Sequence, residues 1–227
     1  MKKYIISAII LILGLSAYYF IYQLKIGDNN MKEANENSKE DLNPVKNNEL
    51  SDVENSAAKQ RKISNGMNPR ATLETSMGNI TIELYPKDAP KTVANFIGLA
   101  KKGYYNGVIF HRVVSGFVIQ GGDPTGTGAG GNSIYGGDFE DELDLNTESY
   151  QRGYLKGAVA MANRGPDTNS SQFFIMLEDK SLPKLYTIFG KVAEGDDVVQ
   201  NIGRVKVGAN DKPLAPVIIN KIIVEGN

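Results

Sequence analysis

The sequence predicts a mainly β domain, a closed barrel or sandwich of short strands with helical caps, preceded by a transmembrane helix and a disordered linker. Three observations lead to this fold class. Glycine is frequent, at 24 of 227 residues, which favours turn-rich β structure over a helical bundle. Several short segments alternate apolar and polar residues with the period of half-buried strands. Few segments after residue 69 have helical periodicity, which limits the helices to caps on the β structure.

Residues 1–27 are predicted to form an N-terminal transmembrane signal anchor. The apolar run 4–24 has roughly the 20 residues needed to cross a bilayer. It exceeds the apolar core of a cleaved signal peptide, although a poor cleavage site at Leu15-Ser16-Ala17 leaves a cleaved, secreted form as an alternative. A buried core helix is the remaining alternative. Because Lys2 and Lys3 precede the run, we expect a single-pass protein of the cell membrane whose main domain is extracytoplasmic.

Residues 28–68 are predicted to be a disordered polar linker. The segment is rich in Asn, Glu, Lys and Ser, has few apolar residues and contains no aromatic residue. Such a composition buries too little apolar surface to offset the entropy cost of ordering the chain. The folded domain is therefore expected to span residues 69–227.

Within this domain the elements follow from local patterns. Segments 71–75 and 80–84 alternate as strands, and the turn Met77-Gly78-Asn79 joins them as a hairpin. A helix is predicted to open at Pro90 and to stop at Gly103. A second, short amphipathic helix is predicted at 196–202. The other predicted strands are 108–114, 117–120, 158–162, 172–177, 187–192 and 217–224.

The residue counts exclude several classes of function. The chain has no cysteine, so disulfides, thiolate nucleophiles and Cys-ligated metals are excluded. With His111 as the only histidine, a two-His metal site is excluded and a Ser-His-Asp triad could form only around that residue. A net charge of −1 gives no electrostatic footprint for nucleic acid. We expect no metal and no nucleic-acid partner.

Two long motifs carry a resemblance to a known family. Residues 110–123 read FHRVVSGFVIQGGD and residues 161–175 read MANRGPDTNSSQFFI, followed by FGKV at 189–192. The chain from 69 to its end resembles the cyclophilins, and looks like a bacterial-like, membrane-anchored member. The resemblance implies a closed eight-stranded antiparallel β-barrel capped by two α-helices. It also implies peptidyl-prolyl cis-trans isomerase activity.

The resemblance also assigns site residues. Arg112 matches the family's catalytic arginine, and Gln120 matches the glutamine that helps to hold the substrate carbonyl. The other residues carried over are expected to bind substrate: Phe117, Val118, Phe174 and Leu182 in the proline pocket, Tyr186 in its wall, Ala162 and Asn163 on a ridge that pairs with the peptide backbone, and Gln172 as a neighbouring polar contact. Because Ser181 falls where many relatives have Trp, cyclosporin-type ligands are expected to bind weakly.

The chemistry of prolyl isomerisation fits these residue types. Rotation about a peptide bond is opposed by a barrier of about 18–20 kcal/mol, and prolyl isomers exchange within tens to hundreds of seconds. A catalyst needs no metal, nucleophile or cofactor, and none is expected here. A guanidinium aimed at the prolyl nitrogen can donate to the lone pair that localises there as the bond twists. The expected partners are proline-containing polypeptides, namely secreted or envelope proteins during folding, and the expected oligomeric state is a monomer.

Other interpretations compete with this one. Without the motif, Arg112 would be taken for a solvated surface charge, and His111 is interpreted as structural. The domain could instead be a non-catalytic module that binds proline-containing segments, although a pure binder has no need of the arginine. The run 126–131 fits a G-x-G-x-x-G pattern, but a nucleotide site would require a helix to follow it. We expect a flexible loop beside the active face there, and a solvated acidic surface at 138–144.

Overall fold

The computed structural model of the chain describes residues 68–225. The predicted anchor at 1–27 and the predicted linker at 28–68, except for its last residue, lie outside the described residues. Within the described range, no helix combines the length and the apolar character that a membrane span requires.

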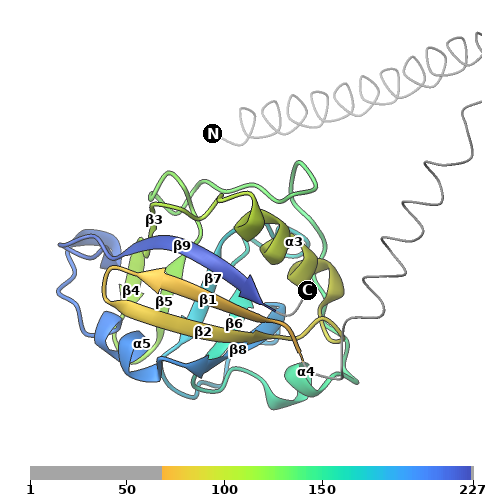
Figure 1. Cartoon of the computed structure of the whole chain (residues 1–227). Coiled ribbons are helices and arrows are strands. Elements are labelled where there is room, and N and C mark those ends of the chain that lie inside the picture. Colours follow the sequence, from red (N-terminus) through yellow and green to blue (C-terminus); the bar gives the residue numbers. More distant parts are fainter. Residues whose placement is uncertain (1–67, 226–227) are drawn as a thin grey trace, which may run out of the picture. The chain divides into compact units, whose positions relative to one another are not determined.

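The strands form one antiparallel sheet that curls around the core (Figure 1). Its spatial order is β3-β9-β1-β2-β8-β6-β7-β5-β4, and each neighbouring pair is antiparallel. Apart from 108–114, each strand predicted from the sequence is present with small shifts at its ends. The bounds are β1 Arg70–Thr75, β2 Gly78–Leu84, β3 Val108–Ile109, β4 Arg112–Val114, β5 Val118–Gly121, β6 Ala158–Met161, β7 Phe173–Met176, β8 Ile188–Glu194 and β9 Ile218–Glu225.

The expected closed barrel of eight strands is corrected by the pairing at the two edges of the sheet. The segment 108–114, predicted as one strand, is divided at Phe110 and His111 into β3 and β4. It pairs first with β9 and then with β5, because the chain passes from one edge of the sheet to the other. No ladder between residues 68 and 225 joins β3 to β4. The result is a curled, nine-stranded sheet. Its two edge strands, β3 and β4, are consecutive in the chain but do not pair with each other.

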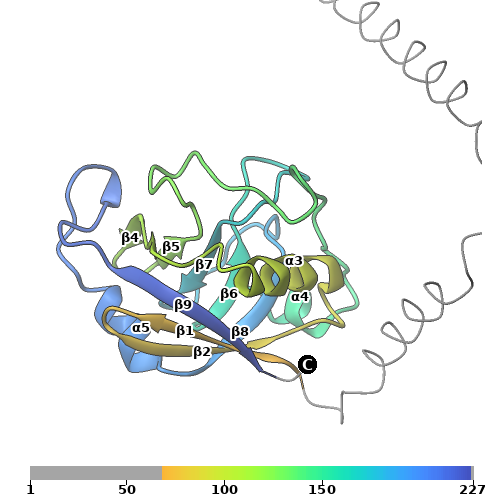
Figure 2. The same ribbon diagram turned by 45° about the horizontal axis from the view of Figure 1, so that its top comes forward.

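Two helices cover opposite ends of this sheet (Figure 2). They are α3 (Pro90–Lys101) and α5 (Asp196–Ile202), as the sequence predicted. Phe96 of α3 and Val199 of α5 are fully buried in one core cluster with the inward-facing residues of the strands. Burial of an aromatic or branched side chain of this kind contributes roughly 1.5–3 kcal/mol, so packing rather than helix propensity stabilises these short helices.

The acidic stretch 138–144 has structural roles that the expectation of a solvated surface missed. The Glu142 carboxylate accepts hydrogen bonds from the backbone N–H groups of Lys91 and Thr92 at 2.9 and 2.8 Å. It thereby caps the N-terminus of α3, where backbone donors have no helical partner. Asp138 pairs with Arg164 at 3.0 Å. A short helix follows, α4 (Glu148–Arg152), which the sequence did not predict because its five residues have no apolar period.

Candidate functional site

Strand register places the main predicted residues in one row across four strands. Arg112 on β4 is directly opposite Gln120 on β5, Gln120 is opposite Phe174 on β7, and Phe174 is opposite Ala160 on β6. Residues directly opposite one another share a face of the sheet. The neighbouring residues Val113, Ile119 and Phe173 point the other way, into the main core. The two-residue period of the strands therefore gathers the candidate site on the outer face of the sheet.

A groove of about 390 Å³ lies along this row. Its lining includes nine of the ten residues carried over from the family resemblance, together with Pro183 and Leu185. The nine are Arg112, Phe117, Val118, Gln120, Ala162, Asn163, Phe174, Leu182 and Tyr186. Sequence reasoning missed Pro183 and Leu185, whose only signal was that they flank Leu182 and Tyr186 in the same loop.

The floor and walls of the groove are apolar because they belong to a second hydrophobic cluster, separate from the main core. Val118 and Phe174 are 2% and 6% exposed. The Phe174 ring meets the Tyr186 ring edge-on, with 5.5 Å between centroids. Tyr154, which the sequence did not single out, fixes this wall: its hydroxyl donates to Tyr186 O and accepts from Tyr186 N, both at 3.0 Å. The result is an apolar pocket with the hydrophobic and aromatic lining that is typical of ligand sites.

The polar side of the groove is a chain of side-chain hydrogen bonds that begins at Arg112. Its Nη1 donates to Gln120 Oε1 at 3.4 Å, and Gln120 Nε2 donates to Gln172 Oε1 at 3.0 Å. Gln172 Nε2 in turn donates to the carbonyls of Gly128 and Gly130 at 3.0 and 2.8 Å. Gln172 is 6% exposed and does not line the groove. It lies behind Gln120 and fixes which way the Gln120 amide points.

The glycine-rich run 126–131 is fastened to Asp123. This fully buried carboxylate accepts hydrogen bonds from the backbone N–H groups of Thr125, Thr127, Gly128 and Gly130 at 2.7–3.1 Å. Burial alone would raise the pKa of Asp123, but the hydrogen bonds from Thr125, Gly130 and Gly128 outweigh it and lower the pKa to about 2. The next helix, α4, begins only at Glu148, so the run lacks the helix that a dinucleotide site requires.

His111 is buried beside the groove rather than in it. It is 6% exposed, and neither ring nitrogen has a hydrogen-bond partner among residues 68–225. Burial lowers its pKa, so the ring is neutral at physiological pH. Among residues 68–225, therefore, no nucleophile is hydrogen-bonded to this ring as a nucleophile-base pair would require.

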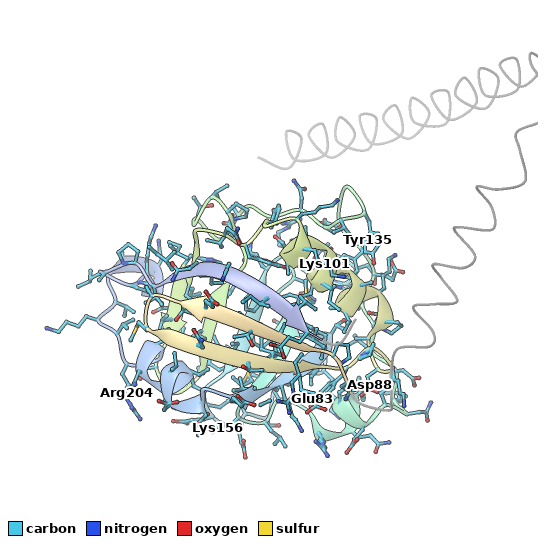
Figure 3. The ribbon with its side chains drawn as sticks, in the orientation of Figure 1. Glu83, Asp88, Lys101, Tyr135, Lys156 and Arg204 are labelled. Carbon is cyan, nitrogen blue, oxygen red and sulfur yellow. The ribbon has the colours of Figure 1, made fainter. Side chains whose placement is uncertain are left out.

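A second cavity of about 290 Å³ has a different character. It is lined by charged side chains of both signs, including Glu83, Asp88, Arg152 and Lys191. Figure 3 shows Glu83 and Asp88 near one another, and Lys156 and Arg204 further along the surface. Hydrogen bonding from Asn68 is the main cause that lowers the pKa of Glu83. The cavity lacks the apolar walls that a proline ring would need.

The fold and the groove together define a class of protein: a curled β domain with an open groove that has an arginine at its edge and an apolar pocket beside it. Comparison with known proteins supports the assignment to the family that the two motifs resemble. The model of the family "Cyclophilin type peptidyl-prolyl cis-trans isomerase/CLD" matches residues 70–224. The chain therefore belongs to the cyclophilin-type peptidyl-prolyl cis-trans isomerases, which confirms the family and the enzyme class that the resemblance implied.

Relatives and solved structures are similar over the same part of the chain. Peptidyl-prolyl cis-trans isomerase CYP18-2 of Arabidopsis thaliana is 50% identical, over 68% of this chain and 92% of the relative. A putative peptidyl-prolyl cis-trans isomerase of Staphylococcus aureus is 43% identical, over 69% of this chain and 91% of the relative. A crystal structure of a Cryptosporidium parvum cyclophilin-type isomerase has a TM-score of 0.63 at 39% identity, covering 70% of this chain and 98% of that one. The same protein was also solved in the presence of the dipeptide Ala-Pro.

Proposed function

We propose that the groove beside Arg112 is where this isomerase rotates Xaa-Pro bonds, with Arg112 as the catalytic residue. The observation that carries the proposal is the row Arg112–Gln120–Phe174, which sets a guanidinium next to an apolar pocket. A proline ring seated on Phe174 would bring the prolyl nitrogen towards Arg112. The donor would then meet the lone pair that forms only as the bond twists, which lowers the barrier rather than merely strengthening binding.

The pocket residues hold the proline while the preceding residue rotates. Phe117, Val118, Phe174 and Leu182 supply the apolar contact, and Tyr186 closes the wall. Arginine suits the catalytic position because it stays charged and holds its donors in a rigid fork. Gln120 holds the substrate carbonyl, and Gln172 acts through Gln120 by fixing its amide.

The backbone at Ala162 and Asn163 is proposed to pair with the extended substrate. The side chain of Asn163 donates to Leu185 O at 2.9 Å, so this ridge is tied to the opposite wall of the groove. Ser181 is exposed at the end of that wall and offers no indole to a cyclosporin-type ligand, which is the basis for expecting weak inhibition. The non-catalytic binding module is less favoured, since it leaves the placement of Arg112 without a purpose.

We also propose that the enzyme is membrane-anchored and acts outside the cytoplasm on secreted or envelope proteins, as a monomer. The support is the sequence of residues 1–27, with Lys2 and Lys3 ahead of an apolar run, and the polar composition of 28–68. A bacterial-like origin is part of the same proposal.

A protease-coupled isomerisation assay on a proline-containing peptide tests the activity. The expected result is a rate well above the uncatalysed exchange, and a rate equal to the uncatalysed one would sink the proposal. Topology is tested separately by adding protease to intact cells. Digestion of residues 69–227 supports an extracytoplasmic domain, whereas their protection until the cells are lysed contradicts it.

A further inference from the structure

The chain between α5 and β9 forms a small hairpin, residues 206–214, outside the motifs of the family resemblance. Gly208 N donates to Lys212 O at 2.8 Å, and Leu214 N donates to Lys206 O at 2.9 Å. The tip is the 3₁₀ turn η1 (Ala209–Asp211). Asn210 and Asp211 both have left-handed backbones, with φ of 58° and 59°. Asn and Asp tolerate this conformation better than most residues, which lets the tip turn sharply.

The tip of this hairpin reaches the candidate catalytic site. Asp211 Oδ2 lies 3.5 Å from Arg112 Nε. The next residue, Lys212, donates from Nζ to Gly126 O at 3.2 Å. Figure 2 shows the hairpin, in blue, beside β4, the strand that carries Arg112. Two consecutive residues of one tip therefore contact the catalytic arginine and the glycine-rich loop.

These contacts close a ring around the arginine. One side of the ring runs from Arg112 through Gln120 and Gln172 to Gly128 and Gly130. The other side runs from Arg112 through the hairpin tip to the same glycine-rich loop. The Arg112 guanidinium is thus contacted at two atoms: Nη1 by Gln120 Oε1 at 3.4 Å, and Nε by the Asp211 carboxylate, an ion pair at 3.5 Å.

Contacts at two atoms restrict the rotation of a planar guanidinium more than a contact at one atom does. The Arg112 side chain is 39% exposed, so without tethers it would sample several rotamers. Among residues 68–225, no protein acceptor takes a hydrogen bond from Nη2. The two tethers therefore leave an amino group of the fork available for substrate. Its direction matters, because a misplaced catalytic donor lowers the rate even when substrate still binds.

We propose that Asp211 is a positioning residue that orients Arg112 for isomerisation. The inference rests on the proposed catalytic role of Arg112. Asp211 has no predicted contact with substrate and acts through the arginine. Its benefit comes from orientation, since the negative charge itself weakens the field of the guanidinium.

Two substitutions separate the carboxylate from the backbone conformation. Asp211→Gly removes the carboxylate and keeps the left-handed turn, because glycine adopts positive φ without strain. Asp211→Asn keeps the shape and removes the charge. Asn210→Gly is the matched control, with the same backbone change at a neighbour that does not contact Arg112. We expect Asp211→Gly to lower kcat about three- to ten-fold with KM nearly unchanged. The kcat of Asp211→Asn should lie between those of Asp211→Gly and wild type. The kcat of Asn210→Gly should equal that of wild type.

Three outcomes distinguish the possibilities. If wild type is active and Asp211→Gly has the same kcat as Asn210→Gly, the positioning role is overturned. A kcat of Asp211→Gly above that of wild type overturns it as well. A wild type without activity sinks the proposed function instead. If Asp211→Gly does not fold, Asp211→Asn is assessed in the same way. Unfolding free energy is measured on the same variants: Asp211→Gly should stay within about 1 kcal/mol of Asn210→Gly, and a loss of kcat matched by an equal loss of stability would contradict the positioning role.

Discussion

Replacing Asp123 by Asn should loosen the glycine-rich loop and destabilise the domain. The carboxylate accepts from four backbone N–H groups and from the hydroxyls of Thr125 and Thr127. An amide has only one acceptor oxygen. With its NH₂ group turned towards Thr125, it would leave the Thr125 N–H unpaired, and the opposite orientation would leave three N–H groups unpaired.

The size of the effect follows from the pKa of Asp123. The pKa is about 2 in the folded protein against an ordinary value of 3.8. A difference of nearly two pKa units corresponds to about 2.5 kcal/mol. Loss of the charge and one unsatisfied buried donor together should therefore cost about 2–3 kcal/mol of unfolding free energy at neutral pH. Because the folded-state pKa is the lower one, the wild-type advantage is complete above about pH 4 and is lost as the pH falls towards about 2.

Urea denaturation of wild type and Asp123→Asn at several pH values measures this difference. The expected gap is about 2–3 kcal/mol at pH 7 and shrinks between about pH 4 and pH 2. A gap below about 0.5 kcal/mol at pH 7, or one independent of pH, would refute the reasoning. Asp144→Asn is the matched control: its exposed carboxylate caps only a surface turn at Asn146, where Asn serves equally well. It should change stability by less than about 0.5 kcal/mol.

Three further predictions concern residues around the groove. Gly122→Ala should lower the unfolding free energy by more than about 3 kcal/mol, because φ is 90° and a Cβ would lie 2.3 Å from Ser171 O. A thermal or urea melt measures this loss, and a loss under about 1 kcal/mol would be inconsistent with the packing. Leu182→Ala should raise KM about three- to ten-fold at nearly constant kcat, whereas Leu155→Ala, outside the groove, should leave KM unchanged. If the two variants have the same KM, Leu182 does not bind substrate. Because burial lowers the pKa of His111, the unfolding free energy of wild type should decline as the pH falls below 6.5. The His111→Gln variant should lack this decline. An unfolding free energy of wild type that does not change with pH in this range would contradict the prediction.

Most of the fold was predictable because strand periodicity is local. The alternation at 71–75 and 80–84 marked the hairpin, and Pro90 marked the start of α3. The division of 108–114 was not predictable, since it depends on a change of partner from β9 to β5. Nor was the role of Glu142 as a cap for α3, which joins residues about fifty positions apart.

The candidate site was predictable as far as the motifs reach. Arg112, Gln120 and Phe174 are held by strand register, so their grouping follows from pairing that the family resemblance implied. Asp211 was not predictable, because it contacts Arg112 from almost a hundred residues away and depends on a left-handed turn. Tyr154 was missed for a similar reason: its hydroxyl fixes Tyr186 from a loop with no strand or helix signal.

Arg112→Ala tests the central claim most directly. Arg164→Ala is the matched control, an exposed arginine of the second motif that pairs with Asp138 and does not line the groove. The isomerisation assay and a urea melt are run on both variants. The expected result is a loss of kcat/KM of about 10²–10³-fold for Arg112→Ala, with unfolding free energy within about 1 kcal/mol of wild type, and no comparable loss of activity for Arg164→Ala. Retained activity in Arg112→Ala, or a loss matched by an equal loss of stability, would contradict the catalytic role of this arginine.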